Sequence, residues 1–161
     1  MSITIKFNPL EQYEIENLII NFLTLVENEE NEIKELKNLI NEVTKKLKVH
    51  IIVYEEIDNT QKRFLQEITS PEIIIHHIKR GQERQQKLMY LEALGKDKSI
   101  VIGNNNSDSL MLSKSYISIG VITKNGISSE ALSSAKIICN NIINALELCL
   151  TPQKIVEVLR R

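Results

Sequence analysis

The sequence predicts a three-layer α/β fold with a mainly parallel β-sheet. Short apolar runs of strand length alternate with segments of helical spacing along most of the chain. Parallel strands need crossover helices, and the connectors here are short, so this alternation favours a parallel sheet with helices on both faces. All five glycines fall in the second half, where tight turns between short elements are expected. We expect residues 1–161 to form a single domain.

Apolar runs or alternating patterns mark the predicted strands. Ser2–Phe7 alternates apolar and polar side chains, which indicates a half-buried strand that Asn8 and Pro9 end. The run Leu18–Leu23 is apolar apart from Asn21, which suits a strand covered on both faces. The other predicted strands are Val49–Tyr54, Glu72–Ile78, Ser99–Ile102, Tyr116–Ile122 and Lys136–Cys139.

Helical spacing marks the segments between the strands. From Glu29 to Leu47, apolar residues recur at intervals of three and four with charges between them. The final helix is expected to have Thr151 as its N-cap and Pro152 at its first position. This final helix is expected to span Pro152–Arg161. The other predicted helices are Asp58–Ile68, Gln82–Leu94, Asp108–Lys114, Ser128–Ser134 and Asn141–Leu150.

Composition and charge exclude several classes of protein. The chain has 161 residues, of which 42% are hydrophobic, and a formal net charge of −1. This balance predicts a soluble, globular protein and does not favour nucleic acid as a partner. No apolar run reaches the roughly 20 residues of a membrane span. We therefore expect no membrane partner. Cys139 and Cys149 show neither a metal-binding nor a disulfide pattern, so we expect a cytoplasmic protein.

The segment Ser99–Ile122 carries the most informative motif. An apolar strand leads into the loop Gly103–Asp108, with the sequence GNNNSD, and a short helix and a second apolar strand follow. This arrangement resembles the last motif of the haloacid dehalogenase superfamily, especially in the small soluble relatives of the P-type ATPase phosphorylation domain. The other strands follow the order of that family, so the resemblance covers nearly the whole chain. It implies a Rossmann-like, haloacid dehalogenase-like fold without a cap domain.

The resemblance also implies a phosphate-transfer site, in which the reactive residues are replaced. In the family, an aspartate at the end of the first central strand attacks phosphorus and becomes an aspartyl phosphate. Asn21 stands at that position, and its amide is a poor nucleophile. Leu23 occupies the place of the acid partner, and Thr24 is at best a displaced counterpart of the motif threonine. Catalysis by this route is therefore not expected.

Other residues of the implied site are retained. Lys87 corresponds to the lysine that neutralises phosphate charge, and Asp108 to the final carboxylate of the metal motif, with Asn104 as its neutral partner. One carboxylate with amide oxygens predicts only weak Mg²⁺ binding. The residues alone leave two alternatives open. The loop could simply cap a helix with Asp108 at the helix N-terminus, and Lys87 could be a solvent-exposed helix residue.

Two functions fit these observations. The first is a non-catalytic binding or assembly protein whose partner is an unknown protein or a small phosphorylated ligand. The second is a Mg²⁺-dependent phosphohydrolase with an atypical site, in which Glu27 or Glu55 would supply a substitute carboxylate. The sequence favours the first, because removal of a catalytic nucleophile alone can cost on the order of 10⁶ in rate.

Two further patterns bear on binding and assembly. His76 and His77 are adjacent in a predicted strand, so they point to opposite faces and do not suit a shared metal ion. We expect one to be packed and the other exposed. Apolar residues lie on more than one face of the C-terminal helices, which predicts a homo-oligomer that buries part of this surface. The alternative is that these helices simply cover the sheet.

Overall fold

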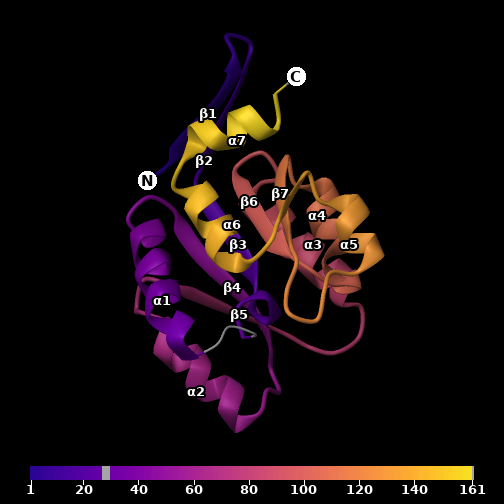
Figure 1. Ribbon diagram of the computed structural model, residues 1–161. Helices are drawn as coiled ribbons and strands as arrows, with labels where there is room; N and C mark the ends of the chain where they lie inside the picture. The colour runs from indigo at the N-terminus through magenta and orange to yellow at the C-terminus, as the bar shows by residue number, and fades with distance from the viewer. Residues whose placement is uncertain (27–29, 161) are drawn as a thin grey trace.

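A six-stranded parallel sheet forms the centre of the computed structural model, which describes residues 1–26 and 30–160 (Figure 1). Its strand order is β5–β4–β3–β6–β7–β8, and every neighbouring pair is parallel. The strands are β3 (Asn17–Asn21), β4 (Lys48–Tyr54), β5 (Ile74–Ile78), β6 (Ser99–Gly103), β7 (Ile117–Val121) and β8 (Ile137–Cys139). The predicted α/β class is confirmed, and in the described ranges no cap domain covers the sheet.

Helices pack on both faces of this sheet and enclose two hydrophobic clusters (Figure 1). One cluster joins the sheet to α1 (Glu30–Thr44), α2 (Asn59–Ile68) and α6 (Ile142–Cys149). The other joins it to α3 (Glu83–Leu94), α4 (Ser109–Lys114) and α5 (Ser129–Ser134). Because successive strand residues point to opposite faces, Leu18 and Ile20 enter the first cluster and Ile19 the second.

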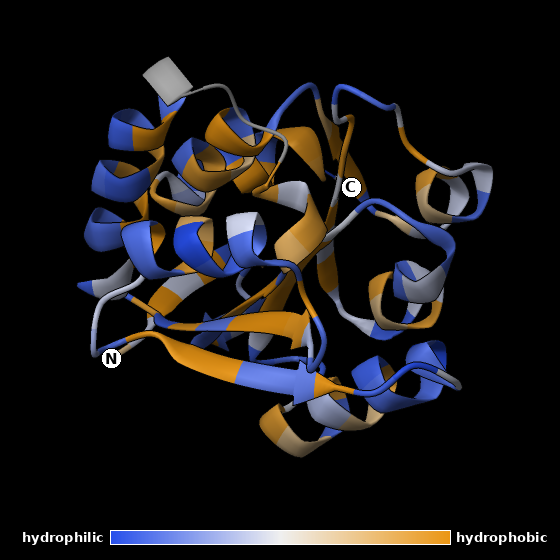
Figure 2. Cartoon of the chain, turned by 90° about the horizontal axis from the view of Figure 1, so that it is seen from below, coloured by the Kyte–Doolittle hydropathy of each residue, from blue (hydrophilic) through white to orange (hydrophobic). Residues whose placement is uncertain are grey.

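Hydropathy follows this layered arrangement. The strands of the central sheet are mostly hydrophobic, whereas the helices carry hydrophilic residues on their outer faces (Figure 2). All five residues of β3 are buried, including its two asparagines. The apolar runs of β3, β6 and β7 therefore mark doubly covered strands, whereas the edge strands β5 and β8 are only partly buried. Within the described residues, no helix has the length and apolar character needed to cross a membrane.

The N-terminal segment forms a separate hairpin outside the central sheet. Strand β1 (Ile3–Asn8) pairs antiparallel with β2 (Glu11–Ile15). The Asn8 Oδ1 atom accepts hydrogen bonds from the backbone N–H groups of Leu10 (2.8 Å) and Glu11 (2.9 Å), which close the turn. The last helix, α7 (Pro152–Val158), packs against β1 (Figure 1). The sequence predicts β1 but not β2, because most residues of β2 are polar.

Several predicted boundaries are wrong. The strand predicted to reach Leu23 ends at Asn21, where the chain turns into a short 3₁₀ helix, η1 (Phe22–Thr24). The final helix ends at Val158, and Thr151 does not cap it with its side chain. The Thr151 hydroxyl instead donates a 2.7 Å hydrogen bond to the Glu147 carbonyl of the preceding helix. Residues 29 and 161, the predicted ends of two helices, lie outside the described residues.

The prediction that one residue of the histidine pair is packed and the other exposed is confirmed. His76 is half-buried and stacks on Tyr90, with ring centroids 4.0 Å apart, whereas His77 is exposed. Cys139 and Cys149 are both free thiols. Burial raises the pKa of Cys149 to about 12, so this thiol stays protonated and unreactive near neutral pH.

Candidate functional site

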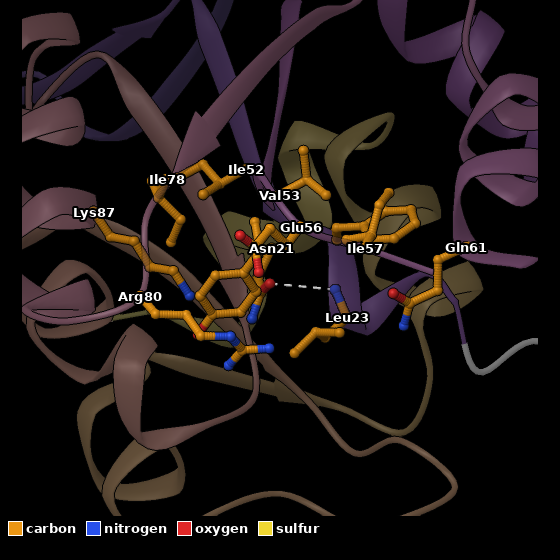
Figure 3. Close-up of a pocket in the computed structure, with 12 residues that line it drawn as sticks. Asn21, Leu23, Ile52, Val53, Glu56, Ile57, Gln61, Ile78, Arg80 and Lys87 are labelled. Atoms are coloured by element: carbon orange, nitrogen blue, oxygen red, sulfur yellow. Dashed lines mark hydrogen bonds between the residues drawn. The ribbon is translucent and has the colours of Figure 1, made fainter. Parts of the chain in front are cut away.

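A pocket of about 240 Å³ lies at the carboxyl ends of β3, β4 and β5 (Figure 3). Ligands bind at this edge of open parallel sheets, because the loops that follow the strands meet there. One part of the pocket wall is apolar and consists of Phe22, Leu23, Ile52, Val53, Ile57 and Ile78. The other part is polar and consists of Asn21, Tyr54, Glu56, Gln61, Arg80 and Lys87.

Asn21 connects the pocket to the loop that follows β6. Its side chain is almost fully buried, and its Nδ2 atom donates a 2.8 Å hydrogen bond to Asp108 Oδ2. Its Oδ1 atom accepts a 3.2 Å bond from the backbone N–H of Leu23, which caps η1 (Figure 3). Thr24 Oγ1 donates to the Asn21 carbonyl at 2.7 Å. Both ends of the Asn21 amide are thus held by the protein.

Asp108 is fully buried, and both of its carboxylate oxygens accept hydrogen bonds. Besides Asn21, the Oδ2 atom binds the backbone N–H groups of Asn104 (2.8 Å) and Asn105 (3.1 Å). The Oδ1 atom lies 2.7 Å from Lys87 Nζ in a buried ion pair. This set of donors satisfies a carboxylate that has been removed from water.

Gly103 makes the close approach of Asp108 possible. A Cβ atom at Gly103 would lie 2.6 Å from the Cβ, Cγ and Oδ2 atoms of Asp108. Asp108 also takes part in a reciprocal capping box with Asn105 around the short 3₁₀ helix η2 (Asn106–Asp108), but its side chain does not cap α4. The helix-cap alternative therefore holds only for η2, and the carboxylate has the additional role of joining the loop to Asn21 and Lys87.

Lys87 is buried, so the alternative of a solvent-exposed lysine is wrong. It is 1% exposed in α3, and its ammonium donates to Asp108 Oδ1 and Ser107 Oγ, both at 2.7 Å. The side chain also lines the pocket (Figure 3). An ammonium has three N–H donors, and these two contacts use two of them.

Arg80 is a pocket residue that the sequence prediction missed. Its guanidinium lies over the ring of Tyr54, 4.6 Å from the centroid. Gln86 fixes the backbone on both sides of Arg80, since its amide accepts from Lys79 N and donates to the carbonyls of Lys79 and Gly81. Because Arg80 follows the carboxyl end of β5, the rule that places ligands beyond the strands could have identified it.

Of the other predicted residues, Leu23 lines the pocket, whereas Thr24, Asn104 and Glu55 do not. Thr24 is buried behind Asn21, and Asn104 contacts Asp108 through its backbone N–H. Glu55 lines only a neighbouring hollow, whereas Glu56 lines the pocket itself. Glu27 lies outside the described residues. Asn21, Leu23 and Lys87 are therefore the predicted residues that meet at the pocket, and Asp108 accepts hydrogen bonds from Asn21 and Lys87.

The donor set around Asp108 does not fit a resident Mg²⁺ ion. Magnesium requires oxygen ligands with lone pairs directed at it. The groups that face Asp108 are instead the N–H donors of Asn21, Lys87 and the loop backbone. The described residues contain no group of three or more His, Cys, Asp or Glu side chains that could hold a metal. One oxygen in this region, Asn104 Oδ1, is buried without a hydrogen-bond partner.

Comparison by sequence yields one relative at high similarity. No protein-family model matches the chain. The uncharacterized protein MJ0073 of Methanocaldococcus jannaschii is 37% identical over 81 residues, which cover 48% of this chain and 87% of that protein.

Comparison by structure finds hydrolases and an ATPase domain. The 3-deoxy-D-manno-octulosonate 8-phosphate phosphatase of Moraxella catarrhalis, in complex with magnesium, phosphate and KDO, has a TM-score of 0.59 at 15% identity, covering 89% of this chain and 90% of that chain. The cobalt-bound form of the corresponding phosphatase of Haemophilus influenzae has a TM-score of 0.54 at 11% identity, covering 90% and 89%. The catalytic domain of the CPx-ATPase CopB-B has a TM-score of 0.53 at 21% identity, covering 73% and 44%.

The structural comparisons confirm the resemblance stated from the sequence. The phosphatases share the parallel sheet over nearly their whole length, and the ATPase domain shares it over part of its length. At these identities the likeness establishes the fold. The sequence comparison establishes kinship, because most of the archaeal protein is covered at 37% identity. The chain therefore has a haloacid dehalogenase-like fold and belongs to the family of the Methanocaldococcus jannaschii protein MJ0073.

Proposed function

We propose that the protein binds the phosphate group of a small phosphorylated ligand in the pocket beside Asn21. The observation that carries this proposal is the presence of Arg80, Lys87 and Asn21 on the polar side of one pocket of about 240 Å³. A guanidinium and an ammonium are the side chains that bind phosphate oxygens most strongly, and an amide adds a neutral donor. The apolar side of the pocket would contact the rest of a small ligand.

Charge balance points to Arg80 as the main contact for the anion. The Lys87 charge is already compensated by Asp108 at 2.7 Å. Glu56 is the acidic side chain of the described lining, and no ion pair among the described residues joins it to Arg80, so the Arg80 guanidinium is available to an anion. Stacking on Tyr54 restricts the guanidinium and leaves its edge N–H groups available for two phosphate oxygens. We therefore expect phosphate to bind between Arg80 and the end of β3.

The arrangement of Asn21 favours binding without aspartyl-phosphate chemistry. The amide cannot form an acyl phosphate, and its nitrogen is directed at Asp108. Leu23 offers no proton donor at the neighbouring position of the pocket wall. The protein would therefore hold its ligand without cleaving it by the family route.

A phosphohydrolase is the second candidate, and the likeness to phosphatase structures favours it. One of those structures contains magnesium and phosphate, and another contains cobalt. In this candidate Glu56 is the carboxylate to test first, because it lines the pocket whereas Glu55 does not. A divalent metal would have to bind apart from the hydrogen bonds that now surround Asp108.

Thermal unfolding with a panel of ligands tests the binding proposal. Inorganic phosphate and sugar phosphates should raise the unfolding temperature, and the unphosphorylated sugars should not. The Arg80→Gln variant should lose this shift. Arg63→Gln, which removes an exposed arginine of α2, is the matched control and should retain it. Equal shifts with phosphorylated and unphosphorylated sugars, or a full shift in Arg80→Gln, would contradict the proposal.

Phosphate release measured in the same samples separates the two candidates. Ligand binding without release, with or without Mg²⁺, supports a binding protein. Release that requires Mg²⁺ and disappears in the Glu56→Gln variant supports the phosphohydrolase.

A further inference from the structure

We infer that the outer edge of β5 is a self-association surface, where β5 of a second copy of this chain pairs antiparallel about a two-fold axis at His76. The two six-stranded sheets would then form one continuous sheet. This inference goes beyond the proposed function. It also concerns a different surface from that of α7, which packs against β1.

The edge of β5 lacks the features that usually prevent association. β5 is the outermost strand on its side of the sheet and pairs with β4 in an unbroken register. Strand edges are usually protected by charged residues, prolines or bulges, or are kept short. Residues 73–78 read IIIHHI, without lysine, arginine, an acidic residue or proline, and Ile74 is 37% exposed. The opposite edge strand, β8, has only three residues. β5 is therefore the edge that can accept another strand.

The backbone groups of β5 point alternately toward β4 and away from it. The Ile78 carbonyl accepts a 2.9 Å hydrogen bond from the backbone N–H of Glu55, which follows β4. Because the N–H and C=O groups of successive strand residues point to opposite sides, the even-numbered residues of β5 face β4. The groups of Ile75 and His77 therefore face outward.

Two residues that flank this stretch already use their outward groups within the chain. The Ile73 N–H donates a 3.0 Å hydrogen bond to the Ser70 carbonyl. The Gln86 amide accepts from the Lys79 N–H (3.1 Å) and donates to the Lys79 carbonyl (2.8 Å). Among the described residues, no hydrogen bond outside the sheet involves the backbone of the two outward-facing residues between them. Their N–H and C=O groups remain available to a further strand.

One register of antiparallel pairing satisfies all of these groups. With His76 on the two-fold axis, Ile75 of one copy lies opposite His77 of the other, and each such pair exchanges two hydrogen bonds. An axis at Ile75 would instead place His77 opposite Ile73, and an axis at His77 would place Ile75 opposite Lys79. The N–H of Ile73 and both groups of Lys79 are already bonded. The hydrogen-bonding groups therefore select the register centred on His76.

The charges at the two ends of β5 favour a second copy as the partner. Glu72 precedes the strand, Lys79 and Arg80 follow it, and all three are exposed. Antiparallel pairing in this register brings Glu72 of each copy to the basic end of the other, whereas parallel pairing would bring like charges together. Lys79 is not among the residues that line the pocket, so this contact does not depend on the pocket arginine. The edge is thus complementary to itself in charge as well as in hydrogen bonding.

Light scattering over a concentration series tests the interface with a matched pair of variants at His77. The His77 side chain is exposed and its N–H faces outward, so proline removes a donor of the interface but no bond to β4. Wild-type protein and His77→Ala, which keeps the N–H, should both self-associate, with a mass that falls on dilution. At the highest concentration His77→Pro should have half the mass of His77→Ala, and a cooperative thermal transition shows that it is folded.

Charge reversal at Glu72 gives a second measurement. Glu72→Lys would bring like charges together at both ends of the paired strands, so it should raise the dissociation constant about threefold to tenfold at low salt. Asp97→Lys is the matched control. It makes the same change at an exposed position before β6, which β4 and β3 separate from β5, and it should leave the dissociation constant unchanged.

Cysteine cross-linking tests the register and does not need the proline variant to fold. His76→Cys would place two thiols opposite each other across the axis in a non-hydrogen-bonded pair, in which the side chains are close. Oxidised glutathione should therefore join the two copies by a disulfide. Ile74→Cys would lie opposite Ile78 and should cross-link no more than the wild-type protein, whose own two cysteines set the background.

Four results would each overturn the inference. The first is a monomeric mass of the wild-type protein at every concentration. The second is a folded His77→Pro protein with the mass of His77→Ala. The third is an equal dissociation constant for Glu72→Lys and Asp97→Lys. The fourth is cross-linking of Ile74→Cys as fast as that of His76→Cys.

Discussion

The Nδ2 atom of Asn21 donates a buried 2.8 Å hydrogen bond to Oδ2 of Asp108, a residue 87 positions away in the sequence. This bond ties the end of β3 to the loop after β6, and these two strands are neighbours at the centre of the sheet. The pocket wall at Asn21 and the buried ion pair behind it are therefore parts of one hydrogen-bonded unit. Changes to either residue should affect both the pocket and the stability of the fold.

Loss of the Asp108 charge should strongly destabilise the protein. Asp108→Asn leaves the buried Lys87 ammonium without a counter-ion, and breaking such a pair from one side typically costs about 3–5 kcal/mol. Urea unfolding measures the free energy of unfolding directly. The matched control is Asp97→Asn, at an exposed position, which should change it by less than about 0.5 kcal/mol.

A double-mutant cycle identifies the source of that loss. If the ion pair is responsible, Asp108→Asn combined with Lys87→Met should cost clearly less than the sum of the two single changes. Simple additivity would show that the two side chains stabilise the protein independently.

Gly103→Ala should destabilise the protein more than Gly120→Ala. At Gly103 the added methyl meets the Asp108 carboxylate at 2.6 Å, and that carboxylate is held by four hydrogen bonds. At Gly120 the nearest atoms, at 2.9 Å, are the flexible ends of Ile127 and Ile138. Overpacking of a rigid site costs about 1–3 kcal/mol. Thermal unfolding of the two variants side by side tests the order, and a lower Tm for Gly120→Ala would contradict it.

His50 should make the fold sensitive to acid. Burial, with smaller effects of Lys48 and His76, lowers the pKa of His50 from 6.5 to about 4. The neutral ring fits its surroundings, because Nε2 lies 3.0 Å from Asn17 Oδ1 and Nδ1 lies 2.6 Å from Tyr90 Oη. As the pH falls below 6.5, the unfolded chain takes up a proton that the folded protein does not bind until about 4. His50 therefore stabilises the folded protein fully above pH 6.5, and this contribution is lost as the pH falls from 6.5 to about 4.

The contribution of His50 to the free energy of unfolding should fall by about 1–3 kcal/mol as the pH is lowered from 6.5 to about 4. Urea unfolding at a series of pH values measures the slope. His50→Asn should flatten it, whereas His77→Asn, at an exposed position, should leave it unchanged. Equal slopes for His50→Asn and wild type would assign the acid sensitivity to other groups.

Hydrolysis of generic phosphomonoesters with Mg²⁺ should not exceed a buffer blank. Asn21 lacks a nucleophilic oxygen, and Leu23 lacks an acid group. The double change Asn21→Asp and Leu23→Asp should restore little activity, because the resemblance to the haloacid dehalogenase superfamily implies a glycine in the loop after this strand and the sequence has none before Gly81. Release of inorganic phosphate is the measurement. Robust wild-type turnover that disappears in Asp108→Ala would contradict this prediction and support the phosphohydrolase candidate.

A homo-oligomer remains our prediction for the assembled state. Ile142, Leu146 and Ile155 are buried within the chain, but Val158 on α7 is 59% exposed. Light scattering at micromolar concentration should give a mass above that of one chain, and Val158→Glu should lower it. Lys154→Glu, which changes an exposed polar position of the same helix, should not. A monomeric mass for the wild-type protein would contradict the prediction.

The sequence predicts the parallel sheet well because its strands are doubly covered. Runs such as Leu18–Ile20 and Ile100–Ile102 are buried on both faces, and only an apolar run satisfies that environment. Strand β2 is not predicted, because its own sequence, EQYEI, has no strand pattern. It forms by pairing with β1 across the turn at Asn8. Local propensity carries no information about such a partner.

The sequence predicts only part of the site, because several of its contacts depend on the tertiary fold. Asn21, Lys87 and Asp108 are found by their order along the chain, but the bond between Asn21 and Asp108 depends on the neighbouring placement of β3 and β6. The burial of Lys87 also depends on the tertiary fold, since a lysine in a helix is usually exposed. Arg80 has no motif around it and is identified only by its position after β5.

The contact between β1 and α7 has a consequence for how the chain folds during synthesis. The hairpin is synthesised before the central sheet, whereas α7, which packs against β1, is synthesised after all strands of that sheet. An isolated two-stranded hairpin is at most marginally stable in water. Ile3, Ile5 and Ile15 share one hydrophobic cluster with Ile155, so this cluster is complete only after α7 has been made. This long-range closure makes the N-terminal hairpin the segment most exposed to misassociation on a stalled or truncated chain.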